Sequence, residues 1–527
     1  MIKTDLKLPY RYTQDSVKDA ITECLPISKA EIKDVRILKR ELTVRDGVPI
    51  YKTTVAFSAD VEKENGLLKM RNRVLPYQDE SFSTMASSFD ARPVVAGSGP
   101  AGLFAALTLA ESGARPIVLE RGLDVDGRRK KIDTFNRLGI LDTECNVQFG
   151  EGGAGTYSDG KLKCGAKDSY KYKVLREFVD GGADESILYS TSAHLGTDKL
   201  PGIVKHVREK IISLGGEFIF SAKLTDLTIR DGILVGVKYE KDGEQIELPT
   251  DTLILATGHS ARDTFSMLKE RGLPLRAKGF GIGMRIEHPR EYINKIVYRD
   301  AASLIEESAS YHLVTHLPSG RSVYSFCMCP GGEVVAATSE EGAIVTNGMS
   351  EYARMADNSN AAILVSVNPE DFGSDDPLAG IELQRRIERA AYGLTSSYKA
   401  PAYRLARLLD SDSASGFSGT QPSYPVGTIE VSPREYLPEY VPSSIAEAMP
   451  DFDAWLNGYL YSDAALTGPE TRTTSPVRIE RESDGCAVGF VGIYPTGEGA
   501  GYAGGIVSSA VDGIKMAQKA IEKHPKQ

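Results

Sequence analysis

The chain has 527 residues, of which 41% are hydrophobic and 25% charged, as in soluble globular proteins with about two to four domains. Its formal net charge of −10 argues against a general surface for nucleic acid or anionic membrane. The six scattered cysteines do not indicate a disulfide framework, the first ten residues lack the apolar stretch of a signal peptide, and the sequence contains no run of roughly eighteen apolar residues. We therefore expect a cytoplasmic protein that binds neither nucleic acid nor membrane, and whose oligomeric state the sequence leaves open.

Residues 1–88 are predicted to form a small α+β domain. Ile2–Leu8 alternates in hydrophobicity like a strand, and Gln14–Leu25 has the spacing of a helix. Two further apolar runs predict a hairpin that turns at Asp46 and Gly47. A polar segment then leads to the next domain.

Residues 93–122 read PVVAGSGPAGLFAALTLAESGARPIVLERG, which predicts a buried strand, a glycine-rich turn, a helix and a second strand ending in Glu120. Glu120 follows the turn by roughly the 20 residues at which a ribose-binding carboxylate is expected. The three glycines of G-x-G-x-x-G permit the tight turn, the approach of a pyrophosphate and the packing of helix on strand. N–H groups at the start of the helix are suited to phosphate. The predicted dinucleotide-binding turn consists of Gly97, Ser98, Gly99, Pro100, Ala101 and Gly102.

A second cofactor signal is the run LILATG, residues 253–258, an apolar strand that breaks at Gly258. In flavoproteins of the two-dinucleotide type such a segment returns the chain to the cofactor. The alternative is a buried strand before an ordinary turn. The preceding sequence predicts a strand that brings Ala222, Lys223 and Leu224 toward an adenine, which favours the cofactor interpretation.

A third signal lies at residues 494–514, which read YPTGEGAGYAGGIVSSAVDGI. Its glycines repeat the G-x-G-x-x-G spacing, but no second strand and no acid follow, so we do not expect a second dinucleotide fold. The segment predicts a helix that begins between Gly504 and Ile506 and stabilises negative charge at the pyrimidine edge of a flavin. Glu498 is placed to hydrogen-bond the ribityl chain. Together the three signals indicate FAD more than NAD.

Two patterns resemble anion sites. The segment GTYSDGKL, residues 155–162, nearly fits a P-loop, but Leu162 stands where Mg²⁺ needs a Ser or Thr, and no strand precedes it. The basic run from Arg128 to Lys131 is interpreted as a solvated helix face.

His312, His316, Cys327 and Cys329 resemble a zinc-ligand set, although the C-x-C spacing is tight. The two cysteines have two other interpretations. They could form a redox pair, with strain because they are only one residue apart, or they could be packed, reduced thiols.

The segments GSGPAGLFAAL, NVQFGEGGAGTYSDGKL, HLGTDKL, ATGHSARDTF, GIGMRIEHP, FCMCPGGEVV, ETRTTSPVRI and YPTGEGAGYAGGIVSSAVDGI occur in this order. With them the chain resembles the uncharacterised bacterial FAD-dependent dehydrogenases of the glutathione-reductase-like flavoprotein superfamily, over almost its whole length. The resemblance implies a non-covalently bound FAD. It also implies that further residues hold this FAD, namely Glu120, Arg121, Gly152, Gly153, Ala154, Gly155, Lys161, Gly258, Gly497, Glu498, Gly504, Gly505 and Ile506.

We expect an α/β protein with a Rossmann-like FAD-binding domain in two parts, 89–274 and 463–527, and an inserted mixed α/β substrate domain at 275–462. The expected activity is that of an FAD-dependent oxidoreductase that transfers a hydride between flavin N5 and a small substrate, with an anion favoured. NADH or NADPH, if either is the electron donor, must reach the flavin without a domain of its own. The alternatives are an oxidase, a double-bond reductase, or a non-catalytic flavin-binding sensor or interaction protein.

The candidate catalytic residues come from the two crossings between the predicted domains and from the last strand. They are Arg285, Glu287, His288, Arg472 and Tyr494. Arg285 and Arg472 carry permanent charge and forked donors, which suit a carboxylate or another anion. The alternative is that each arginine pairs with a nearby acid, such as Glu287 or Glu470, and holds the domain junction together.

Overall fold

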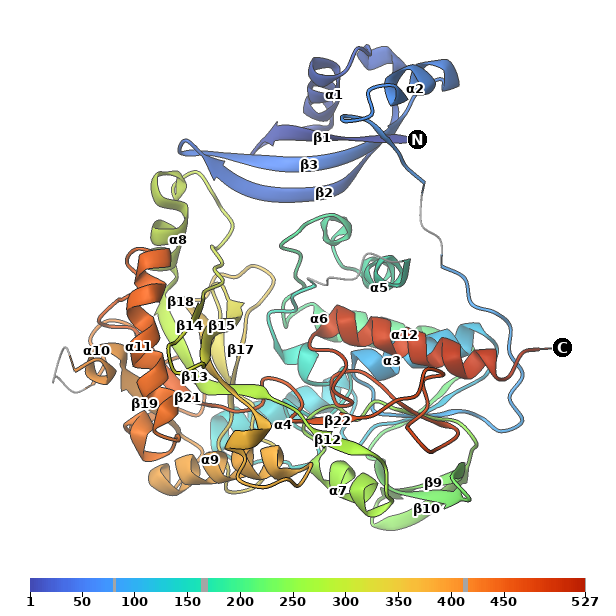
Figure 1. Cartoon of the computed structure of the whole chain (residues 1–527), viewed down its shortest axis with the longest axis vertical. Helices are drawn as coiled ribbons and strands as arrows, with labels where there is room; N and C mark the ends of the chain where they lie inside the picture. Colours follow the sequence, from blue (N-terminus) through green and yellow to red (C-terminus); the bar gives the residue numbers. More distant parts are fainter. Residues whose placement is uncertain (79–81, 163–168, 411–415, 527) are drawn as a thin grey trace.

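The computed structural model describes residues 1–78, 82–162, 169–410 and 416–526. Its three parts are a small N-terminal sheet domain, a domain built on a parallel sheet, and a domain built on a large mixed sheet (Figure 1). This architecture confirms the predicted α/β class. No helix within the described ranges combines the length and apolar composition needed to span a bilayer.

The N-terminal domain is a four-stranded sheet of order β2-β3-β1-β4, and it contains the predicted hairpin. Its elements are β1 (Ile2–Pro9), α1 (Gln14–Cys24), β2 (Lys33–Arg45), β3 (Val48–Ser58), α2 (Val61–Leu68) and β4 (Leu75–Pro76). The inward residues of β1, such as Leu6 and Leu8, pack in one core with Val17 and Ile21 of α1. Hydrophobic residues therefore alternate along β1 because successive side chains point to opposite faces of the sheet, of which one is buried.

Edge strand β2 connects this domain to the rest of the protein. The backbone N–H of Arg40 donates to the carbonyl of Tyr189 at 2.8 Å, and the N–H of Thr191 donates to the carbonyl of Arg40 at 3.0 Å. Tyr51 also donates from its hydroxyl to Glu307 at 2.8 Å. The N-terminal sheet is thus fixed to both larger domains.

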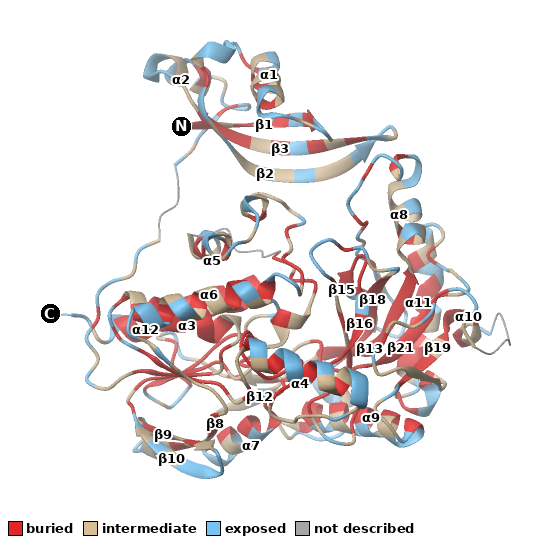
Figure 2. Ribbon diagram, turned by 180° about the vertical axis from the view of Figure 1, so that it is seen from behind, coloured by how far each residue is buried: buried red, intermediate tan, exposed pale blue. Residues whose placement is uncertain are grey.

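The cofactor domain is built on a parallel sheet of order β23-β11-β5-β6-β7. Its strands are β5 (Val94–Ala96), β6 (Ile117–Leu119), β7 (Glu217–Ile219), β11 (Leu253–Leu255) and β23 (Ile493–Pro495). Four of these strands are buried throughout, as expected for a sheet with both faces covered (Figure 2). An antiparallel sheet of β8 (Lys223–Arg230), β9 (Ile233–Lys241) and β10 (Glu244–Pro249) lies at the edge of this domain.

Six helices of the cofactor domain lie within the described residues. They are α3 (Pro100–Glu111), α4 (Val125–Leu138), α5 (Ser169–Asp180), α6 (Leu200–Ser213), α7 (Arg262–Glu270) and α12 (Ile506–Glu522). Helices α3 and α12 pack side by side at very short range, because a Cβ added at Gly513 would lie 2.0 Å from the carbonyl oxygen of Ala101. This contact fixes the C-terminal helix against the start of α3.

The third domain is built on a mixed sheet of order β14-β15-β18-β13-β21-β19-β20. The strands are β13 (Phe280–Pro289), β14 (Val314–His316), β15 (Ser322–Cys329), β18 (Asn358–Val367), β19 (Ala400–Arg404), β20 (Thr428–Glu430) and β21 (Ala465–Glu470). The helices are α8 (Arg290–Tyr298), α9 (Ala379–Thr395), α10 (Leu405–Leu408) and α11 (Tyr440–Trp455). A hairpin of β16 (Glu333–Ala336) and β17 (Thr346–Met349) lies beside the sheet.

The chain passes from the cofactor domain to the mixed-sheet domain at β12 (Leu275–Ala277) and returns at β22 (Val477–Ile479). These two strands pair with each other in antiparallel orientation. Strand β21 belongs to the mixed sheet, so this sheet continues past residue 462, where we expected the inserted domain to end. The reason is that β21 is buried on both faces and therefore lacks the alternation that marks a strand in sequence.

Candidate cofactor and active site

A cavity of about 350 Å³ lies at the carboxyl ends of the parallel strands. Its wall includes residues that directly follow β5, β6, β11 and β23, and a loop over 148–161. The opposite side is formed by the mixed-sheet domain through Phe326, Cys327, Asn347 and Glu470. Ligands of open parallel sheets bind at this edge, and the volume is in the range of cofactor sites.

The three glycines of the first turn differ in what a side chain would meet at each position. Gly97 has a φ of +100°, and a Cβ there would lie 2.4 Å from the carbonyl oxygen of Ala256. A Cβ on Gly102 would lie 1.8 Å from the carbonyl oxygen of Gly97. In contrast, the nearest atom to a Cβ on Gly99 is Cα of Gly153 at 3.8 Å. Packing therefore requires the first and third glycines, whereas the second borders open space in the cavity.

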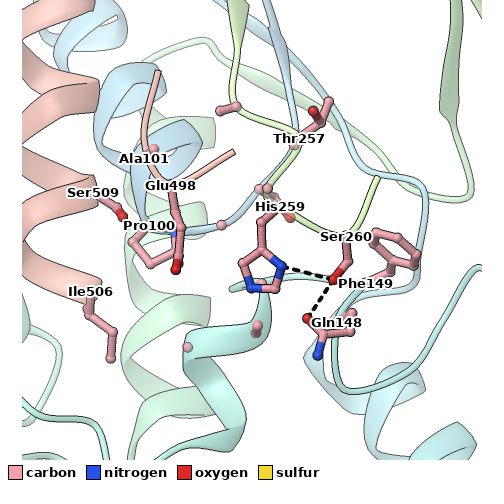
Figure 3. A pocket seen from close by; sticks show the side chains of 18 of the residues that line it. Pro100, Ala101, Gln148, Phe149, Thr257, His259, Ser260, Glu498, Ile506 and Ser509 are labelled. Atoms are coloured by element: carbon pink, nitrogen blue, oxygen red, sulfur yellow. Dashed lines mark hydrogen bonds between the residues drawn. The ribbon is translucent and has the colours of Figure 1, made fainter. Parts of the chain in front are cut away.

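Two helices begin at the cavity with free backbone donors. Gly99 precedes α3 and Gly505 precedes α12, and neither helix start has a side-chain cap. Both glycines line the cavity, as do Pro100 and Ile506, the first residues of the helices (Figure 3). One helix start can hold a pyrophosphate, and the other can face the electron-accepting edge of a flavin. The residues present therefore fit FAD.

Glu120 organises this part of the wall. Its Oε2 accepts from the N–H of Ser98 at 3.0 Å and from the hydroxyl of Ser98 at 2.6 Å. Its Oε1 accepts from the N–H groups of Gly122 at 2.9 Å and Gly150 at 3.0 Å. These four donors use the whole acceptor capacity of a carboxylate. A hydrogen bond from ribose to Glu120 thus requires the Ser98 hydroxyl to turn away.

Arg128 is a functional residue that we interpreted wrongly from the sequence. It is fully buried, whereas Arg129 and Lys130 on the same helix are exposed. The Arg128 guanidinium donates to five backbone carbonyls, those of Asn146, Val147, Gly150, Glu151 and Gly153. Arg128 thus holds the glycine loop in place along the cavity. The residues on either side of it could not reveal this role, because the carbonyls lie 18 or more residues away.

Most of the predicted cofactor residues line one cavity. They are Gly97, Ser98, Gly99, Pro100, Ala101, Glu120, Arg121, Gly153, Ala154, Gly155, Lys161, Gly258, Glu498, Gly504, Gly505 and Ile506. Gly102, Gly152 and Gly497 lie behind the wall, where a side chain would collide with neighbouring atoms. Lys223 does not line the cavity, since its ammonium group pairs with Glu144 at 3.1 Å, although Ala222 and Leu224 on either side do.

Arg285 is fully buried, and the structure supports the structural alternative for it. Its Nε donates to Glu470 at 2.6 Å, and Nη2 donates to the same carboxylate at 3.2 Å and to Asn347 at 2.8 Å. Nη1 donates to the carbonyl of Cys327 and to Asn360. All five N–H groups of the guanidinium are therefore used within the protein. Burial raises the pKa of Glu470 to about 7, although Arg285 opposes this shift.

Three other predicted catalytic residues do not line the cavity. Glu287 is buried and accepts hydrogen bonds from Asn358 and Ser423 within the mixed-sheet domain. His288 is buried beside Tyr459, and burial lowers its pKa to about 4. Tyr494 is buried in the middle of β23, within the core of the cofactor domain. These positions give all three side chains structural roles.

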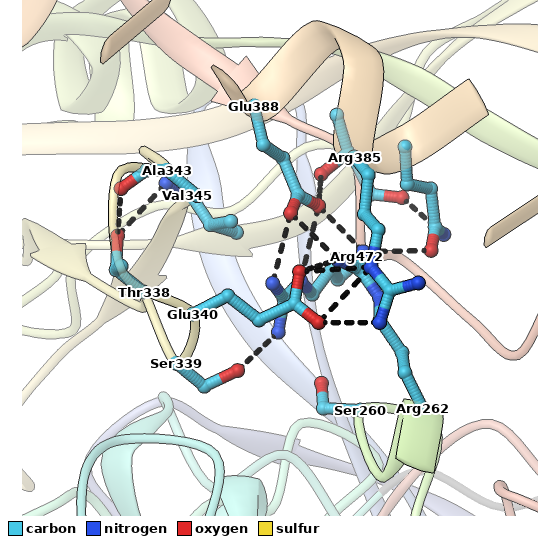
Figure 4. A network of polar contacts seen from close by, with 12 residues as sticks. Ser260, Arg262, Thr338, Ser339, Glu340, Ala343, Val345, Arg385, Glu388 and Arg472 are labelled. Carbon is cyan, nitrogen blue, oxygen red and sulfur yellow. Dashed lines mark hydrogen bonds and ion pairs between the residues drawn. The ribbon is translucent and has the colours of Figure 1, made fainter. Parts of the chain in front are cut away.

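Arg472 lines the cavity and belongs to a buried polar network (Figure 4). Its Nε and Nη2 donate to Glu388 at 3.1 and 2.9 Å, and Nη1 donates to Ser339. Glu388 also pairs with Arg262 at 2.8 Å, and Arg262 in turn pairs with Glu340 at 2.7 Å. The two arginines hold the pKa of Glu388 well below its usual range, although burial alone would raise it. The hydrogen bonds to Glu388 and Ser339 use three of the five N–H groups of Arg472.

His259 is a residue of the cavity wall that sequence reasoning missed. The amide of Gln148 donates to the carbonyl of Ala337, so its Oε1 accepts from the Ser260 hydroxyl at 3.0 Å. Ser260 Oγ lies 3.1 Å from Nδ1 of His259, which must then be the donor (Figure 3). Nε2 of His259 keeps its lone pair, for which the described residues offer no donor. Burial, Arg472 and a second arginine lower the pKa of His259 to about 3, so the ring is neutral.

Glu498 also faces the cavity, and its carboxyl group has no hydrogen-bond partner among the described residues (Figure 3). Burial raises its pKa to about 7, although Lys278 opposes the shift. A carboxyl group of this kind holds its proton near neutral pH and can release it there.

Within the described ranges no group of three or more His, Cys, Asp or Glu side chains is placed to hold a metal ion.

A parallel sheet with a G-x-G-x-x-G turn, a second helix start at the same cavity and a mixed-sheet domain opposite define an FAD-dependent oxidoreductase. A family model described as "FAD-dependent protein, C-terminal domain-like" matches residues 279–473. A protein of Clostridium beijerinckii, described as uncharacterised, is 44% identical over 513 residues, which are 95% of each chain. The chain belongs to this family of FAD-dependent proteins.

Solved flavoprotein structures are similar to a lower degree. The flavin-dependent brominase Bmp2 has a TM-score of 0.38 and 10% identity, with 82% of this chain and 78% of that chain covered. The 3-ketosteroid-Δ4-(5α)-dehydrogenase of Rhodococcus jostii RHA1 has a TM-score of 0.35 and 14% identity, with 85% and 100% covered. Similarities of this size do not define a substrate.

Proposed function

We propose that the protein transfers a hydride between FAD and a small anionic substrate bound between the cofactor cavity and the mixed-sheet domain. The observation that carries this proposal is one cavity wall with three polar side chains, Glu498, His259 and Arg472, whose hydrogen-bonding capacity the described residues use only in part or not at all. Convergent polar groups with free hydrogen-bonding capacity orient and select a ligand. When bound, FAD supplies a carbon-to-nitrogen hydride transfer at N5.

Arg472 supplies the interaction with an anion. Two of its N–H groups have no acceptor among the described residues, and Glu388 holds the guanidinium in one orientation. A carboxylate or phosphate group of the substrate can accept from these two donors. Arg285 is the less suitable anchor, because the protein occupies all of its donors.

Glu498 and His259 supply a proton and an acceptor. A neutral redox change in which a substrate gains or loses a hydride at carbon also moves a proton at a neighbouring oxygen, nitrogen or carbon. Glu498 can hold that proton because its pKa is raised to about 7. Nε2 of His259 can accept a hydrogen bond from a hydroxyl or amine of the substrate. NADH or NADPH as the electron donor is part of this proposal, and it would have to enter the same cavity.

A metabolite screen tests the proposal through the visible absorbance of the flavin. The protein is mixed anaerobically with carboxylates and phosphates, with neutral analogues of the same compounds, and with NADH and NADPH. We expect at least one anionic compound to bleach the flavin, and its amide or ester analogue to need at least about tenfold higher concentration. Bleaching by neutral analogues at the same half-saturation would contradict an anionic substrate, and rapid reoxidation by O₂ would indicate an oxidase.

Arg472→Ala and Ser339→Ala separate the role of the charge from that of the network. Ser339 accepts from Arg472 but does not line the cavity, so its loss leaves the positive charge in place. We expect Arg472→Ala to raise the half-saturating concentration of the identified substrate at least about tenfold, with FAD retained, and Ser339→Ala to change it little. Equal half-saturation in wild type and Arg472→Ala would contradict the anchor.

A further inference from the structure

Cys327 and Cys329 lie at the end of β15, on the substrate side of the cavity. Cys327 lines the cavity, whereas Cys329 is fully buried behind it. The Cys329 thiol donates to the carbonyl oxygen of Cys327 at 3.2 Å. Both are free thiols, and neither has a part in the proposed hydride transfer.

The strand departs from regular geometry at these two residues. Pairing of β15 with β18 shifts register between Phe326 and Cys329, and Cys327 has a φ of +41°. In a regular strand, Cα atoms two residues apart are separated by about 6.6 Å, which is near the upper limit for a disulfide. Because the strand is irregular here, the spacing of a regular strand does not apply to these two residues. A residue with a side chain rarely adopts positive φ, and such residues cluster at functional sites.

Two cations face Cys327. Arg285 donates from Nη1 to its carbonyl oxygen at 2.8 Å, and Lys161 donates to the next carbonyl along the chain. The neighbouring Cys329 side chain, Arg285 and Lys161 lower the pKa of the Cys327 thiol, against burial and Asp159. Cys327 and burial raise the pKa of Cys329. The two thiols are therefore unequal: the one at the cavity ionises readily, and the enclosed one stays protonated.

We propose that Cys327 and Cys329 form a redox-active dithiol that opens to the cavity, with a small organic disulfide as its substrate class. Cys327 is the attacking thiol, and Cys329 is the resolving thiol. This site goes beyond the proposed hydride transfer, since its chemistry needs no flavin.

The exchange has two steps. The Cys327 thiolate attacks one sulfur of the disulfide, so that a mixed disulfide forms and the first substrate half leaves as a thiolate. That thiolate takes the proton of Cys329, whose sulfur then attacks Sγ of Cys327 and releases the second half as a thiolate. The protein loses two electrons and gains one S–S bond, while the substrate gains two electrons and becomes a thiol and a thiolate.

Mass spectrometry of the FAD-loaded protein tests this proposal without any measurement of turnover. The protein is incubated with bis(2-hydroxyethyl) disulfide, quenched in acid, alkylated and digested with trypsin. Cys327 and Cys329 then lie in one peptide, residues 322–354, and exposed Cys24 lies in another, residues 19–29. We expect an internal disulfide in the first peptide, with loss of two hydrogens, at a rate at least about tenfold above modification of Cys24. Dithiothreitol should reverse it.

Two serine variants test the order of attack. Cys329→Ser should accumulate a mixed disulfide between Cys327 and the probe, because no resolving thiol remains. Cys327→Ser should leave Cys329 unmodified, because that thiol is enclosed. FAD content and melting temperature are recorded for both, so that a folding defect is recognised.

The proposal is overturned if both thiols of the wild-type protein stay reduced while Cys24 is modified. It is also overturned if Cys329→Ser forms no mixed disulfide although it is folded and retains FAD, or if Cys329 alone reacts in Cys327→Ser. Any of these results would leave packed, reduced thiols as the correct interpretation.

Discussion

At the scale of single residues, hydrogen-bond partners separate arginines that look alike in the sequence. Arg285 and Arg472 were predicted as equivalent anion anchors. The protein accepts hydrogen bonds from every N–H group of Arg285, whereas two N–H groups of Arg472 have no acceptor among the described residues. The sequence identifies the residue type that suits an anion. It cannot reveal the partner, because Glu470 lies 185 residues from Arg285 and no spacing rule connects them.

Arg285→Met should destabilise the protein by about 3–5 kcal/mol, because it leaves the Glu470 carboxylate buried without its partner. The double variant Arg285→Met with Glu470→Leu should recover most of this loss, since no charge remains buried. Urea unfolding, with flavin fluorescence as a second signal, measures both. If Arg285→Met is as stable as wild type, the ion pair does not stabilise the mixed-sheet domain.

Glu498→Gln should change how stability depends on pH. A carboxyl group whose pKa is raised in the folded protein contributes stability that is present below the unfolded pKa, near 4.5, and is lost as pH rises through about 7. Wild type should therefore lose up to about 3 kcal/mol relative to Glu498→Gln between these limits. Melting temperatures of both proteins from pH 4.5 to 8 measure the difference. Parallel pH profiles would show that Glu498 titrates normally.

At the scale of elements, the parts of the fold that follow local patterns were predicted well. The first βαβ unit, the turn between β2 and β3, and the start of helix α12 lie where the sequence predicts them. Their signals are turn glycines and hydrophobic periodicity, which act over a few residues. Strand β21 and the burial of Arg128 were missed, because both depend on distant packing partners.

Arg128→Met should release the glycine loop from helix α4. The carbonyls of Asn146, Val147 and Glu151 would lose their donor, whereas those of Gly150 and Gly153 keep a backbone N–H, and each unsatisfied acceptor costs about 1–3 kcal/mol. We expect FAD affinity to fall at least about tenfold together with the melting temperature. Arg129→Met is the matched control, because Arg129 is exposed one position along the same helix and should retain wild-type affinity. Equal flavin binding by the two variants would show that the loop does not need Arg128.

At the scale of the whole molecule, the cofactor domain and the mixed-sheet domain together enclose one cavity. The N-terminal domain forms hydrogen bonds with both of them. The parallel sheet supplies two helix starts, and the mixed sheet supplies the opposite wall with Cys327 and Glu470. The sequence motifs predicted the residues that the cofactor domain contributes to the cavity wall. It did not predict His259, whose role depends on Gln148 and Ser260 and on a cavity that only the assembled domains enclose.

The flavin content of purified Gly99→Trp, compared with wild type, tests the central claim most directly. A Cβ at Gly99 meets nothing closer than 3.8 Å, so an indole there can enter the cavity without disturbing the fold. Gly393→Trp is the control, because Gly393 is exposed on α9 and has no atom within 4 Å of a Cβ. We predict about one acid-releasable FAD per chain in wild type and Gly393→Trp, and almost none in a folded Gly99→Trp. Stoichiometric FAD in Gly99→Trp, or a wild-type protein that binds no FAD on reconstitution, would contradict the account.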